Sequence, residues 1–441
     1  MNTEARWVPS KGPGSVPAVP RHMEELGIPE ALVTDLILRR AQMEGTSSLG
    51  SMCQALKLSH GIVEAVFRRL RQQQLVEVQG MIGEDYNFHL SAAGNRMATG
   101  RRRLSHYAGP APVSIREYHR MVKAQAAKVK LGRTGLAAAL SDLVVTEELL
   151  AQVGPALVSQ KSLFLYGPTG NGKTSIAERL QRIHQDYVFL PHAVEVDGQV
   201  VMVYDPVVHE RVEVEGLEYD ERYVPCRRPF VAVGGELTSS MLELRLDMAT
   251  QIYAAPLQMK ANNGILLIDD FGRQMISPRK LLNRWIVPLD RRVDYLSLSY
   301  GVKFSIPFQL MVVFSTNLNP RRLADEAFLR RIHNKVYVGP VEPAVFDSIL
   351  DRVVREKGLA SPPEAAPYMR DLCWRAGATE LRACYPGDIC MIAEWIASYE
   401  DRPVELTRED MERAVALYFT REEPEAPGEA EGVGREAADF E

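Results

Sequence analysis

The feature that most constrains this chain is an apolar run that changes abruptly into a glycine-rich loop. The run Leu163–Tyr166 predicts a buried parallel strand. The next residues are Gly167, Pro168, Thr169, Gly170, Asn171, Gly172, Lys173 and Thr174. From Ser175 the spacing is helical, so the loop ends at a helix N-terminus. Glycines let the loop amides turn inward, and together with the helix dipole and a lysine they favour a bound polyphosphate.

The spacing G-x-x-x-x-G-K-T is the Walker A signature, in which Thr174 would place its hydroxyl on Mg²⁺. The alternative is a chance glycine-rich turn between a strand and a helix. Strand, spacing, Lys-Thr pair and helix all occur together, and this combination favours a nucleotide site over residues 167–175. The sequence therefore predicts that the chain binds ATP with Mg²⁺.

Composition limits the class of protein. At 441 residues the chain is too long for one ordinary domain, and its apolar and charged fractions, 46% and 25%, are those of a soluble globular protein. A formal charge of -5 disfavours non-specific polyanion binding by the chain as a whole.

No apolar run has the length of a membrane span and no signal peptide is evident, so we expect a cytoplasmic protein without membrane insertion. The cysteines form no C-x-x-C pair, which predicts reduced thiols; they are Cys53, Cys226, Cys373, Cys384 and Cys390.

The pattern along the chain predicts an α/β protein with several parts. We expect a parallel-sheet nucleotide domain preceded by a winged helix-turn-helix and followed by a small helical region. The expected parts are a flexible tail (1–25), a winged helix (26–100), a basic linker and helix (101–135), the α/β nucleotide-binding domain (136–340, with a hairpin insertion at about 193–225), a helical lid (341–421) and an acidic disordered tail (422–441).

The winged-helix prediction depends on three helical stripes followed by a hairpin, Leu75–Val78 and Tyr86–Leu90. The third helix, after Ser59, carries Arg68 and Arg69 away from its apolar stripe. One interpretation is a recognition helix in a DNA groove. The other, which we favour, is a module for protein contacts or a structural appendage, because fold does not determine function.

A locally basic stretch follows over residues 96–133, interrupted by Gly109–Pro112, which we interpret as an interdomain linker. It holds many arginines and lysines against one acid, Glu117. Such a stretch can lie against nucleic acid phosphates. A solvated linker and helix, or packing on an acidic neighbouring subunit, is favoured over that alternative.

Two further apolar runs end in polar residues. Gly264–Ile268 is followed by Asp269 and Asp270. Ligands bind at the carboxyl ends of parallel strands, so we expect Asp269 to hold Mg²⁺ beside Lys173. The run Phe308–Phe314 predicts a third strand, and Ser315 and Thr316 lead from it to Asn317.

Asn317 is expected either to order the attacking water or to cap the strand, with the two alternatives equally favoured. Two adjacent arginines, Arg330 and Arg331, end a short predicted helix. They usually would face water, but a site with Lys173 as its one cation lacks positive charge for phosphoryl transfer. An arginine from a neighbouring subunit would supply that charge.

Over about residues 140–420 the chain carries, in this order, a strand, the GPTGNGKT loop, a helix, GILLIDD, FSTN, FLRRI and a helical region. This ordered set resembles the AAA+ ATPases. A predicted hairpin at Tyr295–Ile306 makes the layout most similar to the MoxR and helicase-clamp members. With its winged helix in front, the whole chain is similar to bacterial AAA+ proteins described as ATPases with chaperone activity.

This resemblance implies roles for matching positions. Residues 167–174 would be Walker A, Asp269 the Mg²⁺-side carboxylate of Walker B, and Asn317 sensor 1. Arg331, which directly precedes the apolar Ile332, is the preferred arginine finger, with Arg330 as second choice. Leu143 and Val144 match the start of the adenine pocket only weakly.

Two positions depart from the family pattern. Asp270 stands where relatives carry glutamate, the residue that polarises water, and is one methylene shorter, so hydrolysis is expected to slow or the loop to shift. Gly387 stands where relatives carry the sensor 2 arginine. Arg382, one turn earlier, either substitutes for it or sensing by the lid is lost.

The sequence thus predicts a Mg²⁺-dependent ATPase with sites at the subunit interfaces of a homo-oligomeric ring, expected to be a hexamer. Its expected work is chaperone-like remodelling of a protein partner recruited by the winged helix. One alternative is a DNA-acting AAA+ protein that uses the winged helix and basic stretch. Another is a binding module that uses ATP as a slow switch, which Asp270 makes plausible.

Overall fold

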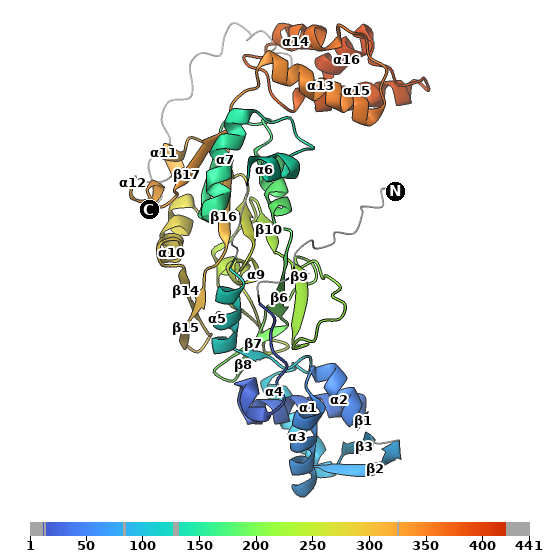
Figure 1. Ribbon diagram of the computed structural model, residues 1–441, viewed down its shortest axis with the longest axis vertical. Helices are drawn as coiled ribbons and strands as arrows, with labels where there is room; N and C mark the ends of the chain where they lie inside the picture. Colours follow the sequence, from blue (N-terminus) through green and yellow to red (C-terminus); the bar gives the residue numbers. More distant parts are fainter. Residues whose placement is uncertain (1–11, 13–14, 83–84, 127–131, 324–325, 420–441) are drawn as a thin grey trace, which may run out of the picture. The chain divides into compact units, whose positions relative to one another are not determined.

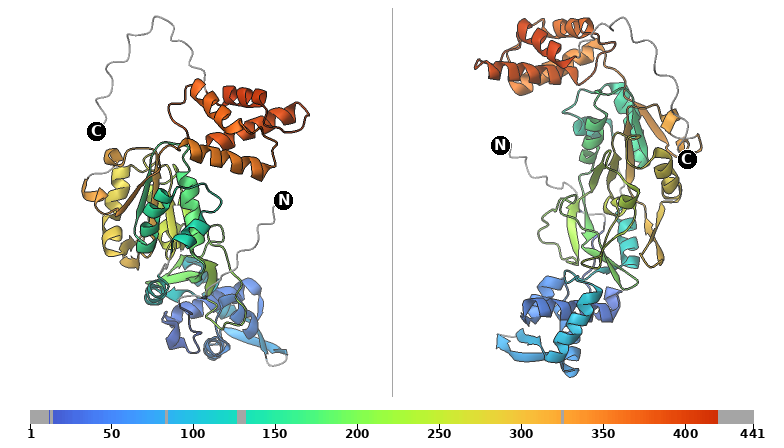
Figure 2. Two further views of the ribbon diagram at one scale, coloured as in Figure 1. Left: turned by 45° about the horizontal axis from the view of Figure 1, so that its top comes forward. Right: turned by 180° about the vertical axis from the view of Figure 1, so that it is seen from behind.

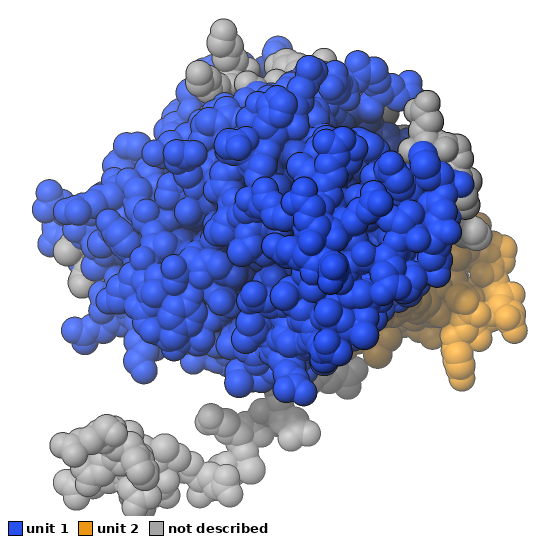
Figure 3. All heavy atoms as spheres, turned by 90° about the horizontal axis from the view of Figure 1, so that it is seen from below, with its two compact units in different colours: residues 1–339 blue, residues 340–441 orange. Residues whose placement is uncertain are grey.

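The computed structural model describes residues 12, 15–82, 85–126, 132–323 and 326–419. The chain divides into two compact units, unit 1 (residues 1–339) and unit 2 (residues 340–441) (Figure 3). The acidic tail predicted from residue 422 and most of the N-terminal tail lie outside the described residues. The described end of that N-terminal tail is packed: Pro17 is buried, and its carbonyl accepts a hydrogen bond from the Asp220 amide at 3.1 Å.

Unit 1 contains a parallel sheet that includes the Leu163–Tyr166 strand, and its strands β10, β16 and β17 are labelled in Figure 1. In the described part of the chain its order is β10-β13-β16-β5-β17, and every neighbouring pair is parallel. All carboxyl ends therefore lie along one edge, here called the carboxyl edge, and all amino ends along the opposite, amino edge. The strands are β5 (Leu163–Tyr166), β10 (Phe230–Val233), β13 (Ile265–Ile268), β16 (Met311–Thr316) and β17 (Asn334–Tyr337).

Both faces of this sheet are buried at β5, β13 and β16, which explains why these strands read as apolar runs. The edge strand β17 is partly exposed and is not an apolar run. One face packs in a core with helices that include α8, the helix after the Walker A loop; these are α6 (Arg133–Ala139), α7 (Glu147–Ser159) and α8 (Lys173–Arg179). The opposite face packs on α10 (Pro278–Arg291), whose Trp285 is fully buried. On that face the rings of Phe164 and Phe314 stack, with centroids 5.6 Å apart.

A second sheet in unit 1 contains the hairpin predicted around Asp197 and Gly198. The hairpin pairs antiparallel, but it is the middle of a larger sheet of order β11-β12-β8-β7-β4. Its outer partners come from far along the chain and run parallel to it, β4 beside β7 and β12 beside β8. The strands are β4 (Val113–Ser114), β7 (Ala193–Val196), β8 (Gln199–Met202), β11 (Arg245–Asp247) and β12 (Ile252–Ala254).

Two further antiparallel pairs complete the described strands of this region. The pair β14 and β15 matches the hairpin expected between the second and third strand ends of the nucleotide domain. The short helix α9 lies just before β13 along the chain. The bounds are β6 (Tyr187–Pro191) with β9 (Tyr223–Arg227), β14 (Val293–Ser297) with β15 (Lys303–Pro307), and α9 (Leu257–Lys260).

The region expected to be a basic linker is in part embedded in unit 1. Helix α5 (Ile115–Ala124) buries Tyr118, Met121 and Val122 in the core of the second sheet. Arg222 donates a hydrogen bond to the Pro112 carbonyl at 3.2 Å, inside the supposed linker. The short apolar stripe at i, i+3 and i+4 is surrounded by basic residues, so composition concealed it.

The N-terminal part of unit 1 consists of helices around a small sheet of order β1-β3-β2. Its core also contains Ala193 and Val200 of the second sheet, so this part packs directly on that sheet. The elements are α1 (Glu30–Glu44), β1 (Thr46–Ser48), α2 (Leu49–Leu56), α3 (His60–Gln72), β2 (Val76–Ile82), β3 (Asp85–Leu90) and α4 (Ala92–Leu104).

Unit 2 is helical in its described residues and has a core of its own (Figure 2). Its helices are α13 (Pro343–Lys357), α14 (Ala365–Arg375), α15 (Tyr385–Tyr399) and α16 (Arg408–Tyr418). Two short helices, α11 (Pro320–Leu323) and α12 (Glu326–Leu329), precede β17 in unit 1. Among the described residues, no helix combines the length and apolar character needed to cross a membrane.

Candidate nucleotide-binding site

The Walker A loop joins β5 to α8 at the carboxyl edge of the central sheet. Gly167 has φ 143°, and a Cβ at this position would lie 2.2 Å from the Val338 carbonyl oxygen. Gly172, the N-cap of α8, has φ 81°. Only glycine adopts these conformations without strain, so the loop path depends on glycines where the pattern has them. The loop then ends at the first turn of α8, where a helix favours anions.

Lys173 is the first residue of α8, and its side chain returns into the loop. It is buried, and its Nζ donates hydrogen bonds to the carbonyls of Gly167 at 2.9 Å and Pro168 at 2.7 Å. Burial lowers the pKa of Lys173, while the nearby carboxylates of Asp269 and Asp270 act in the opposite direction. A buried ammonium group bordered by two carboxylates is well suited to neutralise phosphate oxygens and to lie near a cation.

Thr174 and Asp269 join the first and second of the predicted strand ends. The Thr174 hydroxyl donates a hydrogen bond to Asp269 Oδ2 at 2.8 Å, across 95 residues of sequence. Asp269 Oδ1 accepts from the Asp270 amide at 3.0 Å, which fixes the carboxylate plane.

These two side chains fit Mg²⁺ by their chemistry. A hydroxyl and a carboxylate are hard oxygen donors, and Mg²⁺ commonly binds one or two carboxylates together with substrate phosphates. Among the described residues, no group of three or more His, Cys, Asp or Glu side chains is arranged to hold a metal ion. A metal bound by Thr174 and Asp269 would therefore take its further ligands from nucleotide oxygens and water.

Asp270 follows at the same edge in an unusual backbone conformation. It is exposed and has φ 47°, in the left-handed region that non-glycine residues seldom occupy. Two contacts hold the backbone here: Gln274 Nε2 donates to the Asp269 carbonyl at 2.7 Å, and the Phe271 amide donates to the Ser315 carbonyl at 2.7 Å. The reach of Asp270 is therefore determined by a turn that neighbouring elements stabilise.

Strand β16 begins later than predicted, at Met311 instead of Phe308, and it extends to Thr316. Residues 308–310 precede the strand, and Arg292 donates a hydrogen bond to the Leu310 carbonyl at 2.9 Å. Asn317 is half-buried and directly follows the strand end at the carboxyl edge. Residues near positions 166, 269 and 317 thus end three neighbouring strands, with β16 between β5 and β13.

Sequence reasoning missed the residues that brace this edge. Thr316 is buried, and its hydroxyl donates to the Phe271 carbonyl at 2.6 Å and accepts from the Leu318 amide at 3.1 Å. Together with Gln274 it ties the turn that carries Asp270 to the end of β16. No sequence signal could have identified these residues, because each acts through a partner distant in sequence or through backbone atoms.

Leu143 and Val144 lie in the segment between α6 and α7, and both are half-buried. Leu143 packs against the core that contains β5 and α8. Asp142 fixes this segment to α8 through an ion pair with Arg179 at 3.0 Å, and to the turn after α8 through one with Arg182 at 2.6 Å. Burial would raise the pKa of Asp142, but its hydrogen bonds to Arg182 and Arg179 outweigh this and lower it.

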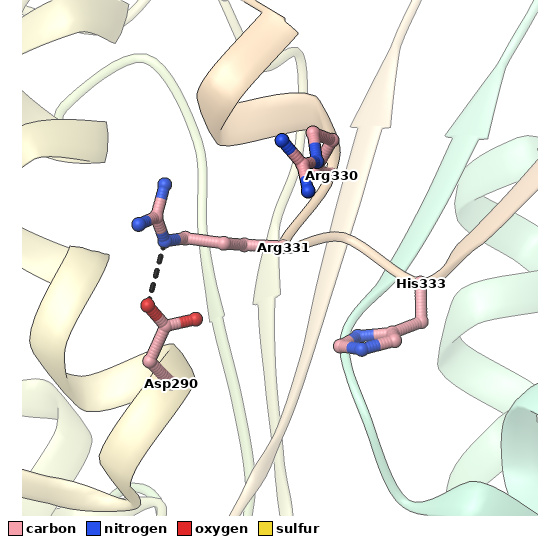
Figure 4. Close-up of a pocket in the computed structure, with 4 residues that line it drawn as sticks. All are labelled: Asp290, Arg330, Arg331 and His333. Carbon is pink, nitrogen blue, oxygen red and sulfur yellow. Dashed lines mark hydrogen bonds and ion pairs between the residues drawn. The ribbon is translucent and has the colours of Figure 1, made fainter.

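Arg330 and Arg331 lie at the amino edge, far from the Walker A loop of the same chain. They follow α12 and precede β17, and the Ser162 hydroxyl, just before β5, donates to the Arg331 carbonyl at 3.4 Å. Arg331 forms an ion pair with Asp290 of α10 at 2.7 Å (Figure 4). The structure therefore does not bring either arginine to Lys173 within one subunit.

Arg382 belongs to unit 2 and precedes α15. Its Nε lies 3.8 Å from Glu380 Oε1, and its guanidinium lies over the Tyr385 ring at 5.9 Å from the centroid. Gly387 lies in the first turn of α15, and a Cβ there would meet open space. The described contacts of Arg382 are thus made within unit 2.

The comparisons with known proteins give distant similarities. Residues 342–417 match the family described as "Domain of unknown function (DUF8689)". A search of curated proteins found no match to the sequence. Among solved structures, the chain is similar to NtrX from Brucella abortus in complex with ADP, with 15% identity, TM-score 0.39, and coverage of 67% of this chain and 59% of that chain.

A second solved structure, a RuvB mutant (A156S) from Thermotoga maritima, has 13% identity and TM-score 0.39, and the match covers 63% of this chain and 71% of that one. The chain thus spans about 59% of the NtrX structure. At this identity and TM-score, neither likeness assigns an activity. The central sheet of the described residues, with its Walker A loop between β5 and α8, identifies an α/β fold of P-loop type.

Proposed function

We propose that this protein is a Mg²⁺-dependent ATPase of the AAA+ type with its site at the carboxyl edge of the central sheet. The observation that carries the proposal is the 2.8 Å hydrogen bond from Thr174 to Asp269, next to the buried Lys173. It joins the Walker A loop to the end of β13, and so brings a phosphate-binding loop and a potential metal ligand together.

The residues divide the chemistry between them. Lys173 neutralises β- and γ-phosphate oxygens, and Thr174 and Asp269 would hold Mg²⁺. Mg²⁺ held by these two side chains would supply positive charge to the phosphates. Asp270 and Asn317 orient the attacking water, and Asp270 accepts its proton. The segment with Leu143 and Val144 borders the adenine.

The proposal includes assembly of identical subunits into a head-to-tail ring, expected to be a hexamer. A heterologous contact of this kind brings different surfaces of two copies together and closes when its rotation closes. Support comes from the position of Arg330 and Arg331 at the edge opposite the Walker A loop. In such a ring the amino edge of one copy faces the carboxyl edge of the next.

The expected output is remodelling of a protein partner recruited through the N-terminal helices and small sheet. In the competing DNA-acting function, α3 and the end of α4 grip the duplex. Exposed Arg71, Arg102 and Arg103 favour that alternative, whereas Arg68 is already paired with Glu64 at 2.7 Å. A DNA-binding assay across a salt series, with the charge-reversal variant Arg71→Glu/Arg102→Glu/Arg103→Glu, separates the two, because phosphate contacts weaken steeply with salt.

The third candidate is an ATP-dependent switch with slow turnover. The left-handed conformation and short side chain of Asp270 favour it. Single-turnover phosphate release by the wild-type protein tests it directly. A rate of phosphate release near that of spontaneous hydrolysis, together with tight ATP binding, would favour the switch function over the motor function.

The decisive test of the ATPase itself is the Lys173→Ala variant. We expect loss of hydrolysis, measured as phosphate release, because no other cation contacts the Walker A loop carbonyls in the described residues. Full activity in this folded variant would refute the site.

A further inference from the structure

Helix α15 of unit 2 carries a row of apolar side chains on its solvent side. The helix packs beside α13 and α16 (Figure 1) and buries its inner side in the core of the unit. On the outer side, Met391, Trp395 and Tyr399 follow one another at intervals of four residues and are 36%, 60% and 90% exposed. Contiguous exposed apolar side chains of this size mark an interaction site.

The spacing of this row fits a helix as the occupant. Residues four apart on a helix form one of the ridges that pack into the grooves of another helix. The row from Met391 to Tyr399 is about 12 Å long at roughly 1.5 Å per residue, or about two helical turns. Gly387 continues the row by one more turn, and a Cβ there would meet open space. A partner helix can therefore lie along α15 and approach its backbone closely at the Gly387 end.

The charges around the row favour a basic occupant. Residues 343–418, from the start of α13 to the end of α16, contain 14 Asp and Glu against nine Lys and Arg. Helix α15 itself contains no Lys or Arg, and Glu400 and Asp401 follow at its C-terminus, where the helix dipole favours cations.

The two acids at this end differ in their partners. Glu400 forms ion pairs with Arg402 at 2.8 Å and with Arg413 at 2.7 Å. Asp401 is exposed and forms no ion pair with any residue that the structure describes. A cation of a partner placed next to Asp401 would therefore be stabilised by this carboxylate and by the dipole of α15.

The same charges disfavour a second copy of this chain as the occupant. A two-fold contact brings the same surface patch of two subunits together. When two such rows pair antiparallel, the Asp401 end of each meets the Asp388 end of the other, and when they pair parallel, Asp401 meets Asp401. Like charges placed opposite each other oppose association. An anionic membrane surface would repel the acidic unit for the same reason.

We infer that the outer face of α15 is a docking surface for a basic amphipathic helix of a protein partner, with Trp395 as its anchor. Met391 and Tyr399 extend the apolar contact on either side of Trp395, and Asp401 binds a Lys or Arg of the partner. Tryptophan is a common anchor because it buries a large rigid surface. The inference is independent of the proposed ATPase, because the surface belongs to unit 2 and takes no nucleotide.

Binding of labelled synthetic peptides to the full-length protein, measured by fluorescence anisotropy, tests the surface. The first peptide is a helix of about 18 residues with one row of leucines, spaced three or four apart, and lysines on both flanks. The second has the same composition with the leucines scattered. We expect the first peptide to bind at least about tenfold more tightly, because only its apolar row matches the row on α15.

Variants of the protein locate the contact. Trp395→Ala should weaken binding of the first peptide by about 30-fold or more, as expected for a central tryptophan. Trp374→Ala is the matched control: it removes a tryptophan of α14 that is 46% exposed and lies outside the row, and affinity should stay within about twofold. Tyr399→Ala, at the most exposed position of the row, gives a second test and should weaken binding by about fivefold.

The charge of the partner is tested at Asp401. Asp401→Lys should weaken binding of the lysine peptide and strengthen binding of a peptide with glutamate in place of lysine, because the sign of the contact is reversed. Unchanged affinities of both peptides would contradict the role of Asp401. Circular dichroism checks that each variant keeps its helices.

Four results would overturn the inference. Wild-type protein and Trp395→Ala could bind the lysine peptide equally, or the ordered and scattered peptides could bind equally. Sedimentation without peptide could show a wild-type oligomer that Trp395→Ala alone dissociates, which would assign the face to a second copy. Vesicles of phosphatidylserine and phosphatidylcholine could bind wild-type protein but not Trp395→Ala, which would assign it to a membrane.

Discussion

The two edges of the central sheet carry opposite chemistry. The carboxyl edge gathers the carboxylates Asp269 and Asp270 around one buried cation, Lys173. The amino edge gathers cations around one carboxylate, Asp290. Each edge thus holds one part of the charge that phosphoryl transfer needs, and the proposed head-to-tail contact between copies would join the two parts. Activity should therefore depend on both edges in different ways, and variants at each edge test this dependence.

The largest effect is expected at Lys173. Replacing it by alanine removes the cation that holds the phosphates and should lower phosphate release by about 1,000-fold or more, by analogy with other preorganised charges in buried sites. Nucleotide affinity, measured by titration with a fluorescent ATP analogue, should fall as well. Unchanged affinity together with lost turnover would limit Lys173 to a role in the reaction step.

The next effect concerns Asp270. Asp270→Asn cannot accept a proton from water and should slow turnover by about 100-fold while ATP binding persists. Asp270→Glu adds the methylene that the chain lacks at this position and should raise the single-turnover rate. A lower rate for the glutamate variant would mean that the turn at φ 47° is shaped for the shorter side chain.

A smaller effect is expected at Thr174. Thr174→Ala removes one oxygen from the proposed metal site and should raise the Mg²⁺ concentration for half-maximal turnover by about tenfold or more. Thr174→Ser keeps the hydroxyl and serves as the matched control. An unchanged Mg²⁺ requirement in the alanine variant would remove the hydroxyl from the site.

The smallest effect is expected in stability at the amino edge. The side chains of Arg331 and Asp290 are 30% and 43% exposed, and such a pair contributes only about 0.2–1 kcal/mol. Asp290→Asn should therefore lower Tm by about 2 °C or less, measured by calorimetry. A much larger drop would make the pair a structural support of the whole unit.

The two edges also differ in how far their residues could be predicted from the sequence. The carboxyl edge was predictable because its chemistry is local: the glycines, Lys173 and Thr174 are consecutive, and Asp269 directly ends an apolar run. The amino edge was only half predictable. Arg330 and Arg331 stand out in the sequence, but the partner of Arg331, Asp290, lies 41 residues away on helix α10.

The fold shows the same division. Runs such as Ile265–Ile268 predicted the central strands because both sheet faces are buried. The second sheet escaped prediction because β4 and β12 are two or three residues long and pair with strands far along the chain. Likewise, the three buried residues of α5 could not be recognised among basic neighbours before their packing partners were known.

The most direct test of the account is an experimental structure of the Asp270→Asn variant with ATP and Mg²⁺. The account predicts the triphosphate in the loop of residues 167–174, with the metal ion between the Thr174 hydroxyl, Asp269 and the phosphates. Lys173 should then leave the carbonyls of Gly167 and Pro168 for the phosphates. A triphosphate bound elsewhere, or a Lys173 that keeps its loop carbonyls beside bound ATP, would contradict it.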